Sequence, residues 1–106
     1  MSTGALTKFA HAQIANAQGT LVAAIASGKA AYITNIKIYN NNGTDETITL
    51  WVNDGTNSYK VWGATLGAGE YADPGRIDLV AGESVEGATT TAAKVTFRAA
   101  GILETI

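Results

Sequence analysis

The chain has 106 residues, a net charge of −2, no cysteine and 15% charged residues, compared with about 25% charged residues in an average soluble domain. The lack of cysteine excludes a disulfide framework and thiol chemistry, and the lack of a basic run excludes the electrostatic footprint of a nucleic-acid-binding protein. No apolar stretch approaches the ~18 residues of a membrane span, so we expect one domain with neither nucleic-acid nor membrane partners.

The N-terminal third predicts an arm and two strands. Residues 1–6 (MSTGAL) are expected to form a flexible arm before a single β-sandwich domain over residues 7–106. Residues 7–15 alternate like a weak strand and lack the capping and spacing of a helix. Residues 19–26 (GTLVAAIA) predict a strand that is apolar on both faces, so it is either deeply buried or covered by another subunit. The start of the chain also lacks the pattern of a secretory signal, which favours folding in a cytoplasm.

The central feature is a predicted β-hairpin over residues 29–55, in which two alternating apolar and polar runs flank a polar connection with a glycine. We expect the core face of this hairpin to pair Ile38 with Ile48, Ile36 with Leu50, and Thr34 with Val52. The opposite face then pairs Tyr39 with Thr47, Lys37 with Thr49, and Asn35 with Trp51. A slip by one residue would turn the isoleucines to water, so this face assignment is strongly specified.

Shorter strands follow at regular intervals. They are predicted over residues 58–63, after an Asp-Gly turn at 53–57, and over residues 70–73, 76–80, 83–88 and 94–103. The only proline, Pro74, marks a tight turn or a crossing between sheets. Gly101 predicts a β-bulge or a bend in the last strand.

A corner pattern recurs three times, in the segments IASGK (25–29), LGAGE (66–70) and LVAGE (79–83). In each, an aliphatic residue anchors under the core, a glycine supplies a positive φ angle, and a charged residue faces water. About eight short strands, frequent turns and no convincing helix predict an all-β fold. We expect a single antiparallel β-sandwich or jelly-roll-like domain.

No pattern in the sequence predicts catalysis. His11, the only histidine, has no carboxylate or cysteine at ligand spacing and no nucleophile pattern nearby. The acidic residues do not alternate as they do in a calcium-binding loop, and the glycines form no phosphate-binding loop. We therefore expect no enzyme activity, no cofactor and no metal site.

The aromatic residues are the better functional candidates. Tyr39 and Trp51 are predicted on the hairpin face opposite the isoleucines, and we expect Trp62 on the next strand to share that face. Such a surface suits a protein interface, which we favour, but also the chain's own second sheet or a platform for sugar rings. With the doubly apolar strand included, the candidate interface residues are Leu21, Val22, Tyr39, Trp51 and Trp62.

From residue 21 to residue 102 the sequence resembles small virion proteins of tailed bacteriophages. The likeness lies in the strands YITNIKIYN and ETITLWVN, in the LGAGE and LVAGE corners, and in the final VTF strand. The resemblance implies a structural or adhesive role on the virion, usually as an oligomer.

We therefore predict a non-enzymatic bacteriophage virion structural protein, made in the host cytoplasm and located in the virion. Its expected form is a homotrimeric capsid decoration (cement) protein that stabilises the head shell. Its expected partner is the major capsid protein or another virion protein, and the three-fold state comes from the resemblance rather than from particular residues. The alternative is a tail- or baseplate-associated structural or carbohydrate-binding adhesion module.

Overall fold

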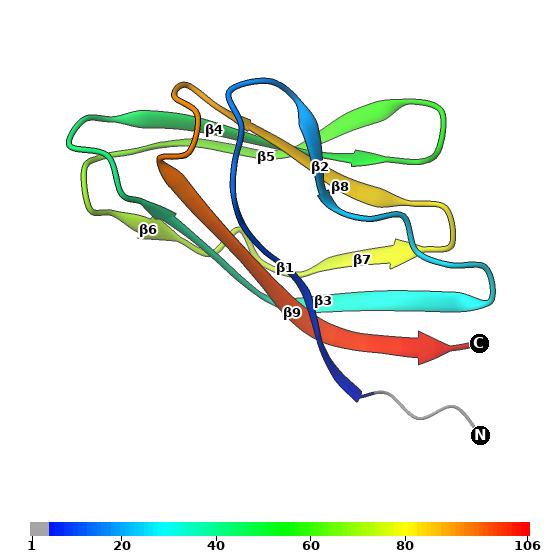
Figure 1. The fold of residues 1–106 in the computed structure, drawn as a ribbon. Coiled ribbons are helices and arrows are strands. Elements are labelled where there is room, and N and C mark those ends of the chain that lie inside the picture. The colour runs from blue at the N-terminus through cyan, green and yellow to red at the C-terminus, as the bar shows by residue number, and fades with distance from the viewer. Residues whose placement is uncertain (1–4) are drawn as a thin grey trace.

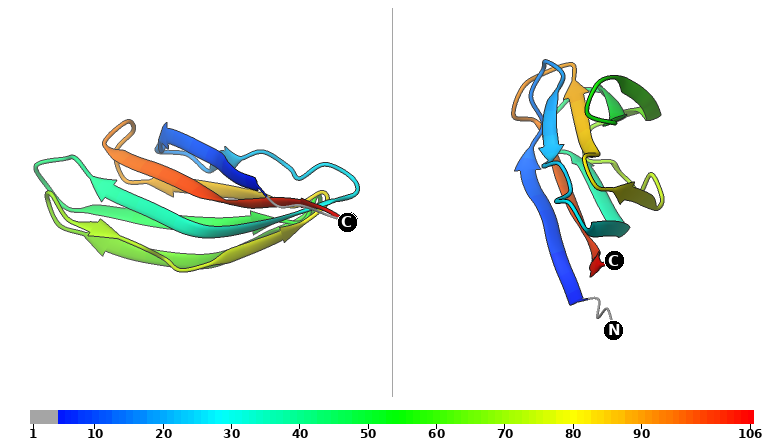
Figure 2. Two further views of the ribbon diagram at one scale, coloured as in Figure 1. Left: turned by 90° about the horizontal axis from the view of Figure 1, so that it is seen from below. Right: turned by 90° about the vertical axis from the view of Figure 1, so that its right-hand side faces the viewer.

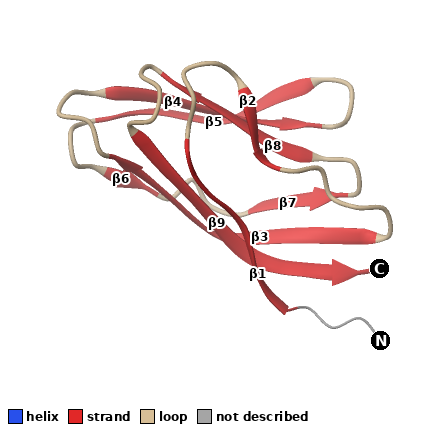
Figure 3. Ribbon diagram, in the orientation of Figure 1, coloured by secondary structure: helices blue, strands red, loops and turns tan. Residues whose placement is uncertain are grey.

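The computed structural model describes residues 5–106, and every regular element in that range is a β-strand (Figure 3). None of the described chain forms a helix long and apolar enough to cross a membrane. The strands are β1 (Ala5–Gln13), β2 (Gly19–Val22), β3 (Lys29–Asn40), β4 (Glu46–Asn53), β5 (Ser58–Leu66), β6 (Tyr71–Ala72), β7 (Ile77–Val80), β8 (Ser84–Thr89) and β9 (Val95–Thr105).

These strands form two antiparallel sheets packed face to face (Figures 1 and 2). The first sheet has the order β1-β9-β3-β6, with β7 also paired to β3, and the second has the order β2-β8-β4-β5. Because β6 and β7 pair with the two ends of β3, they act as one interrupted strand. Consecutive strands then alternate between the sheets except for the β4–β5 hairpin, which is the connectivity of a jelly roll. The predicted all-β sandwich is confirmed.

The predicted hairpin between β3 and β4 is wrong in its pairing, although its core face is right. The two strands belong to different sheets: β3 pairs with β9, β6 and β7, whereas β4 pairs with β5 and β8. Ile36 and Ile38 on β3 and Ile48 and Leu50 on β4 are fully buried in one core cluster. An alternating pattern determines which face of a strand points inward but does not determine its neighbour. The connection over residues 41–45 crosses between sheets, which are typically ~10 Å apart.

A β-bulge in β3 changes the inward set at one position. The pairing of β3 with β9 shifts between Ile33 and Asn35, so Thr34 is the extra residue. Thr34 is exposed, contrary to the prediction, and Ile33 is buried in the core. Gly101 pairs with Ile33 at the shift, so the bulge expected at Gly101 is present, with its extra residue on β3.

The N-terminal strand begins earlier than the sequence predicts. Of the expected arm over residues 1–6, residues 1–4 lie outside the described residues, whereas Ala5 and Leu6 already belong to β1. They pair with Leu103 and Ile102 on β9.

The three predicted corners share one geometry. Gly28, Gly69 and Gly82 have φ angles of 78°, 74° and 87°, the left-handed region that glycine adopts without cost. In the second and third corners the glutamate does more than face water. The Glu70 carboxylate accepts a hydrogen bond from the Gly67 amide, and the Glu83 carboxylate accepts one from the Val80 amide at 2.9 Å. Each glutamate therefore stabilises its own turn.

A buried polar cluster joins the loops at one end of the sandwich. Glu46 is 1% exposed, and its carboxylate accepts hydrogen bonds from the Asn42 side chain at 2.9 Å and from the Thr91 amide at 2.8 Å. Burial alone would raise the pKa of Glu46, but these hydrogen bonds outweigh it, and the pKa lies below its ordinary value.

We expect this carboxylate to contribute to acid unfolding. Because its pKa is lower in the folded protein than in the unfolded chain, its stabilisation is complete above the ordinary glutamate pKa of ~4.3. That stabilisation is lost as pH falls through the lower, folded-state value. Glu46→Gln should lower the free energy of unfolding at pH 7 and flatten its decline below about pH 5, as measured by urea unfolding at a series of pH values. Parallel pH profiles for the two proteins would contradict this role.

Candidate functional site

The structure separates the five predicted interface residues instead of bringing them together. Val22 is buried in the core, and Leu21 and Trp62 pack against it. Tyr39 lies on the outer face of the first sheet, and Trp51 lies on the outer face of the second. The expectation that the two tryptophans share a face is therefore wrong.

A bulge in β5 explains the separation of the tryptophans. Trp62 pairs with buried Leu50, whereas Trp51 pairs with Lys60, which leaves Val61 as an extra residue between them. The extra residue reverses the alternation along β5, so Trp62 turns inward. Trp51 remains outward, because it neighbours the inward Leu50 on a regularly alternating strand.

The doubly apolar strand needs less outside cover than its sequence predicts. The pairing of β2 with β8 shifts between Thr20 and Val22, and Leu21 turns in over Gly87, where an added Cβ would lie 2.5 Å from the Leu21 Cδ1. Ile25 is also buried. Most of the apolar surplus that predicted a neighbouring subunit is thus absorbed by the chain's own core.

We call the outer face of the second sheet around Trp51 the tryptophan face. A row across its four strands contains Thr20, Glu86, Trp51 and Lys60. The next row contains Ala88, Thr49 and Gly63. The side chain of Lys60 lies across Gly63, where an added Cβ would be 2.9 Å from the Lys60 Cε. Trp51 is half-buried, and its small, uncharged neighbours are therefore Thr49 and Ala88.

The charged group next to Trp51 is held in place. The Glu86 carboxylate accepts hydrogen bonds from Ser58 Oγ at 2.5 Å and from Gln18 Nε2 at 2.9 Å. These hydrogen bonds lower the pKa of Glu86, and the bond from Ser58 has the largest effect. The carboxylate is therefore ionised at neutral pH.

The outer face of the first sheet carries a different chemistry, and we call the patch around Tyr39 the tyrosine face. Tyr39 on β3 and Tyr71 on β6 are directly opposite each other, with 42% and 72% of their surface exposed. The next row runs from Lys37 on β3 through Arg98 on β9 to His11 on β1. The patch therefore combines two exposed aromatic rings with a row of cationic and imidazole groups.

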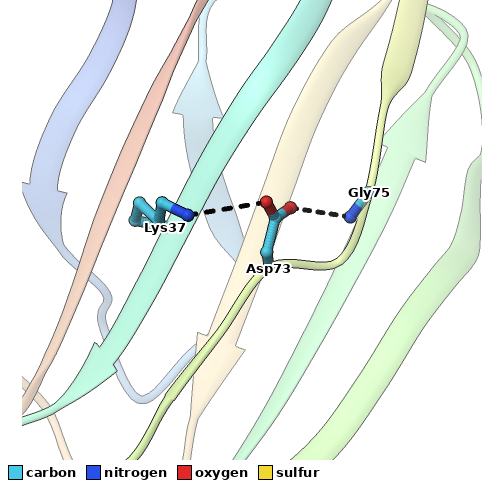
Figure 4. A network of polar contacts seen from close by, with 3 residues as sticks. All are labelled: Lys37, Asp73 and Gly75. Atoms are coloured by element: carbon cyan, nitrogen blue, oxygen red, sulfur yellow. Dashed lines mark hydrogen bonds and ion pairs between the residues drawn. The ribbon is translucent and has the colours of Figure 1, made fainter.

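The cations of this row differ in their partners. Lys37 Nζ lies 3.7 Å from Asp73 Oδ2, and the other Asp73 oxygen accepts a hydrogen bond from the Gly75 amide at 2.9 Å (Figure 4). Arg98 Nη1 lies 3.4 Å from His11 Nδ1. Because a guanidinium can only donate, that imidazole nitrogen acts as the acceptor and brings no negative charge.

Sequence reasoning missed Tyr71 and Arg98. Tyr71 lies on a strand of two residues, which is too short for an alternating pattern. Arg98 lies within the strand predicted over residues 94–103, but its place beside Lys37 depends on the pairing of β9 with β3. Within the described part of the chain, no group of three or more acidic or histidine residues could hold a metal ion.

All four lateral edges of the two sheets carry features that oppose pairing with another strand. Edge strand β1 has a bulge at Phe9, β2 has one at Leu21, and β5 has one at Val61. The fourth edge is divided into β6 and β7 by a segment that contains Pro74. Contacts with another molecule are therefore favoured at the faces rather than at the edges.

No family model and no curated protein matches this sequence. Among solved structures, the chain is similar to a subunit of the disulfide-linked pili of Bacillus endospore appendages, with 18% identity and a TM-score of 0.63. That match covers 100% of this chain and 91% of the pilus chain. A pentameric capsid protein from metagenomic phage sequences aligns with 18% identity and a TM-score of 0.40, over 95% of this chain and 60% of that protein. At this identity, the pilus subunit shows a shared β-sandwich fold.

Proposed function

We propose that this chain is a non-enzymatic structural subunit that associates with copies of itself through the tryptophan face. The observation that carries the proposal is Trp51, a half-buried tryptophan on the outer face of the second sheet, beside the small residues Thr49 and Ala88. The cores of protein interfaces are depleted in charge and enriched in tryptophan, which supplies much of the binding energy. The small side chains of Thr49 and Ala88 would let the surface of another copy approach the indole ring closely.

The protected edges support a contact between faces. An assembly built by strand addition would need an open, regular edge. Here the long edge strands β1 and β5 are both bulged. In a closed three-fold ring, each tryptophan face would meet a different surface of the neighbouring copy, and Trp51 would be covered in every copy.

The pilus subunit with the same fold is in accord with a role in assembly, but its covalent linkage cannot apply to these residues. The 106-residue chain contains no cysteine, so contacts between its copies would be noncovalent. Self-association would then depend on concentration, and a single charged substitution in the contact would weaken it.

The finer part of the proposal is a bacteriophage virion component, namely a trimeric decoration protein bound to the major capsid protein or to another virion protein. Its support is the sequence resemblance over residues 21–102. Mass spectrometry of purified phage particles from the source of the chain tests this part. Absence of the chain from intact particles would contradict it.

Two matched substitutions locate the contact between copies. Thr49→Lys places a charge beside Trp51, whereas Thr96→Lys places the same charge on the outer face of the other sheet, in central strand β9. We expect Thr49→Lys to shift the protein to a later elution volume in size-exclusion chromatography and Thr96→Lys to elute like the wild type. Unchanged circular dichroism would show that both variants are folded. A shift caused by Thr96→Lys alone would place the contact on the first sheet and refute the tryptophan face.

A further inference from the structure

The tyrosine face exposes more aromatic surface than the fold requires. Tyr39 follows buried Ile38 along β3, and Tyr71 precedes half-buried Ala72 along β6. Because side chains alternate along a strand, both tyrosines point away from the core. They are cross-strand partners, so their rings start from backbone positions about 5 Å apart. Two neighbouring rings on a flat sheet form a platform rather than a pocket.

The row beside this platform favours a negatively charged ligand. Arg76, which precedes β7 at the edge of the same sheet, is already neutralised by Asp78 at 2.6 Å, and its guanidinium lies 5.4 Å from the Tyr32 ring centre. Among residues 5–106, Arg98 has no carboxylate partner, and its guanidinium contacts the His11 imidazole. A guanidinium has five N–H donors arranged to hold a carboxylate through two parallel hydrogen bonds, and Arg98 retains most of them.

The size of the patch favours a small ligand. From Tyr71 or Asp73 across to His11 it spans four strands, or roughly 15 Å, and its two rows are roughly 7 Å apart along the strands. Such a patch is far smaller than the ~800 Å² that each partner contributes to a stable protein interface. It matches the size of a short oligosaccharide that lies flat on the sheet.

We propose that the tyrosine face binds an acidic carbohydrate of the uronic-acid class. The apolar faces of the sugar rings pack on Tyr39 and Tyr71, and a sugar carboxylate accepts paired hydrogen bonds from Arg98. The charge of Lys37 is balanced by Asp73 at 3.7 Å, so Arg98 supplies the unpaired positive charge and the Lys37 ammonium group supplies further N–H donors beside it. This site uses the first sheet and is therefore independent of the proposed contact through the second.

The test is titration of the full chain with trigalacturonic acid, followed by calorimetry or by chemical-shift changes. We expect Arg98→Gln and Tyr71→Ala each to raise the dissociation constant by about tenfold or more. This loss of affinity is typical of removing one charge-assisted hydrogen-bond pair or one buried aromatic contact. Two matched controls should bind like the wild type: Arg76→Gln, whose guanidinium is already paired, and Tyr59→Ala, an exposed tyrosine on the other sheet. All four positions are exposed, so the fold should be retained.

Two further probes separate the ring contacts from the charge. The neutral trisaccharide galactotriose lacks the carboxylates, and the peptide triglutamate lacks the rings, so both should bind at least about tenfold more weakly than trigalacturonic acid. Equal binding of triglutamate would show that the face recognises charge alone, as the acidic surface of a protein would supply, and would overturn the carbohydrate proposal. Absence of trigalacturonic acid binding at millimolar concentration would overturn it as well, as would equal losses in the Arg76→Gln control.

Discussion

Gly101→Ala is expected to destabilise the protein by about 3 kcal/mol or more, at the upper end of the overpacking range. A Cβ at this position would lie 1.9 Å from the carbonyl oxygen of Tyr32 and 2.9 Å from the Cα of Ile33. Both are backbone atoms of β3, the strand that pairs with β9 along its whole length. They cannot move away without breaking the pairing between two central strands of the first sheet.

The matched control for this substitution is Gly43→Ala in the connection between β3 and β4. A Cβ there would meet nothing within 4 Å, so we expect the free energy of unfolding to change by no more than ~0.5 kcal/mol. Urea unfolding of both variants measures the difference. A Gly101→Ala protein as stable as Gly43→Ala would show that the close approach of β3 at the bulge is not a constraint on this fold.

The second large effect is expected from Asn40→Ala, which should cost about 3 kcal/mol. The Asn40 side chain is fully buried, and its Nδ2 group donates to the carbonyl oxygens of Thr44 at 2.9 Å, Leu66 at 3.0 Å and Gly67 at 3.1 Å. Its Oδ1 accepts a hydrogen bond from the Asn42 amide at 2.8 Å. Each buried group left without a partner costs ~1–3 kcal/mol.

The neighbouring residue supplies the control for this prediction. Asn41 is exposed, and its backbone amide, which is retained on mutation, donates to the Lys94 carbonyl at 2.8 Å. Asn41→Ala should therefore stay within ~0.5 kcal/mol of the wild type, as measured by thermal unfolding. Equal melting temperatures for the Asn40 and Asn41 variants would indicate that solvent replaces the Asn40 hydrogen bonds, contrary to its burial.

The sequence predicted the inward faces well because they follow from local alternation. Ile36, Ile38, Ile48 and Leu50 are all in the core, and the glycine corners adopt the expected backbone conformation. The pairing of strands is a long-range property that alternation does not contain. For this reason β3 and β4 were expected in one hairpin, although they lie in opposite sheets.

Bulges account for most of the errors at the candidate site. Each bulge adds one residue and reverses the alternation that follows. Because Val61 is an extra residue in β5, Trp62 faces the core. Leu21, an expected interface residue, is itself the extra residue in β2, and its side chain packs over Gly87. No glycine or proline lies at either extra residue, so the sequence carries no local signal for these two bulges. Tyr39 and Trp51 therefore point outward as expected, whereas Trp62 packs against the core, and the role of these aromatic residues in an interface stays a prediction.

The tyrosine face depends on the same long-range information. Tyr39, Tyr71 and Arg98 come from three strands that are far apart in sequence and adjacent only through the order β9-β3-β6. The unbalanced charge of Arg98 becomes visible only when its cross-strand partners, His11 and Lys37, are known. Composition alone predicted a weakly charged chain and could not locate this row.

The central proposal, self-association through the tryptophan face, is tested most directly by the mass of the purified wild-type protein in solution. Multi-angle light scattering over a dilution series should give three times the 10.9 kDa mass of the chain at high concentration and a decreasing mass on dilution, because the contact is noncovalent. A constant mass of one chain at concentrations of tens of micromolar, with β-sheet circular dichroism intact, would contradict self-association.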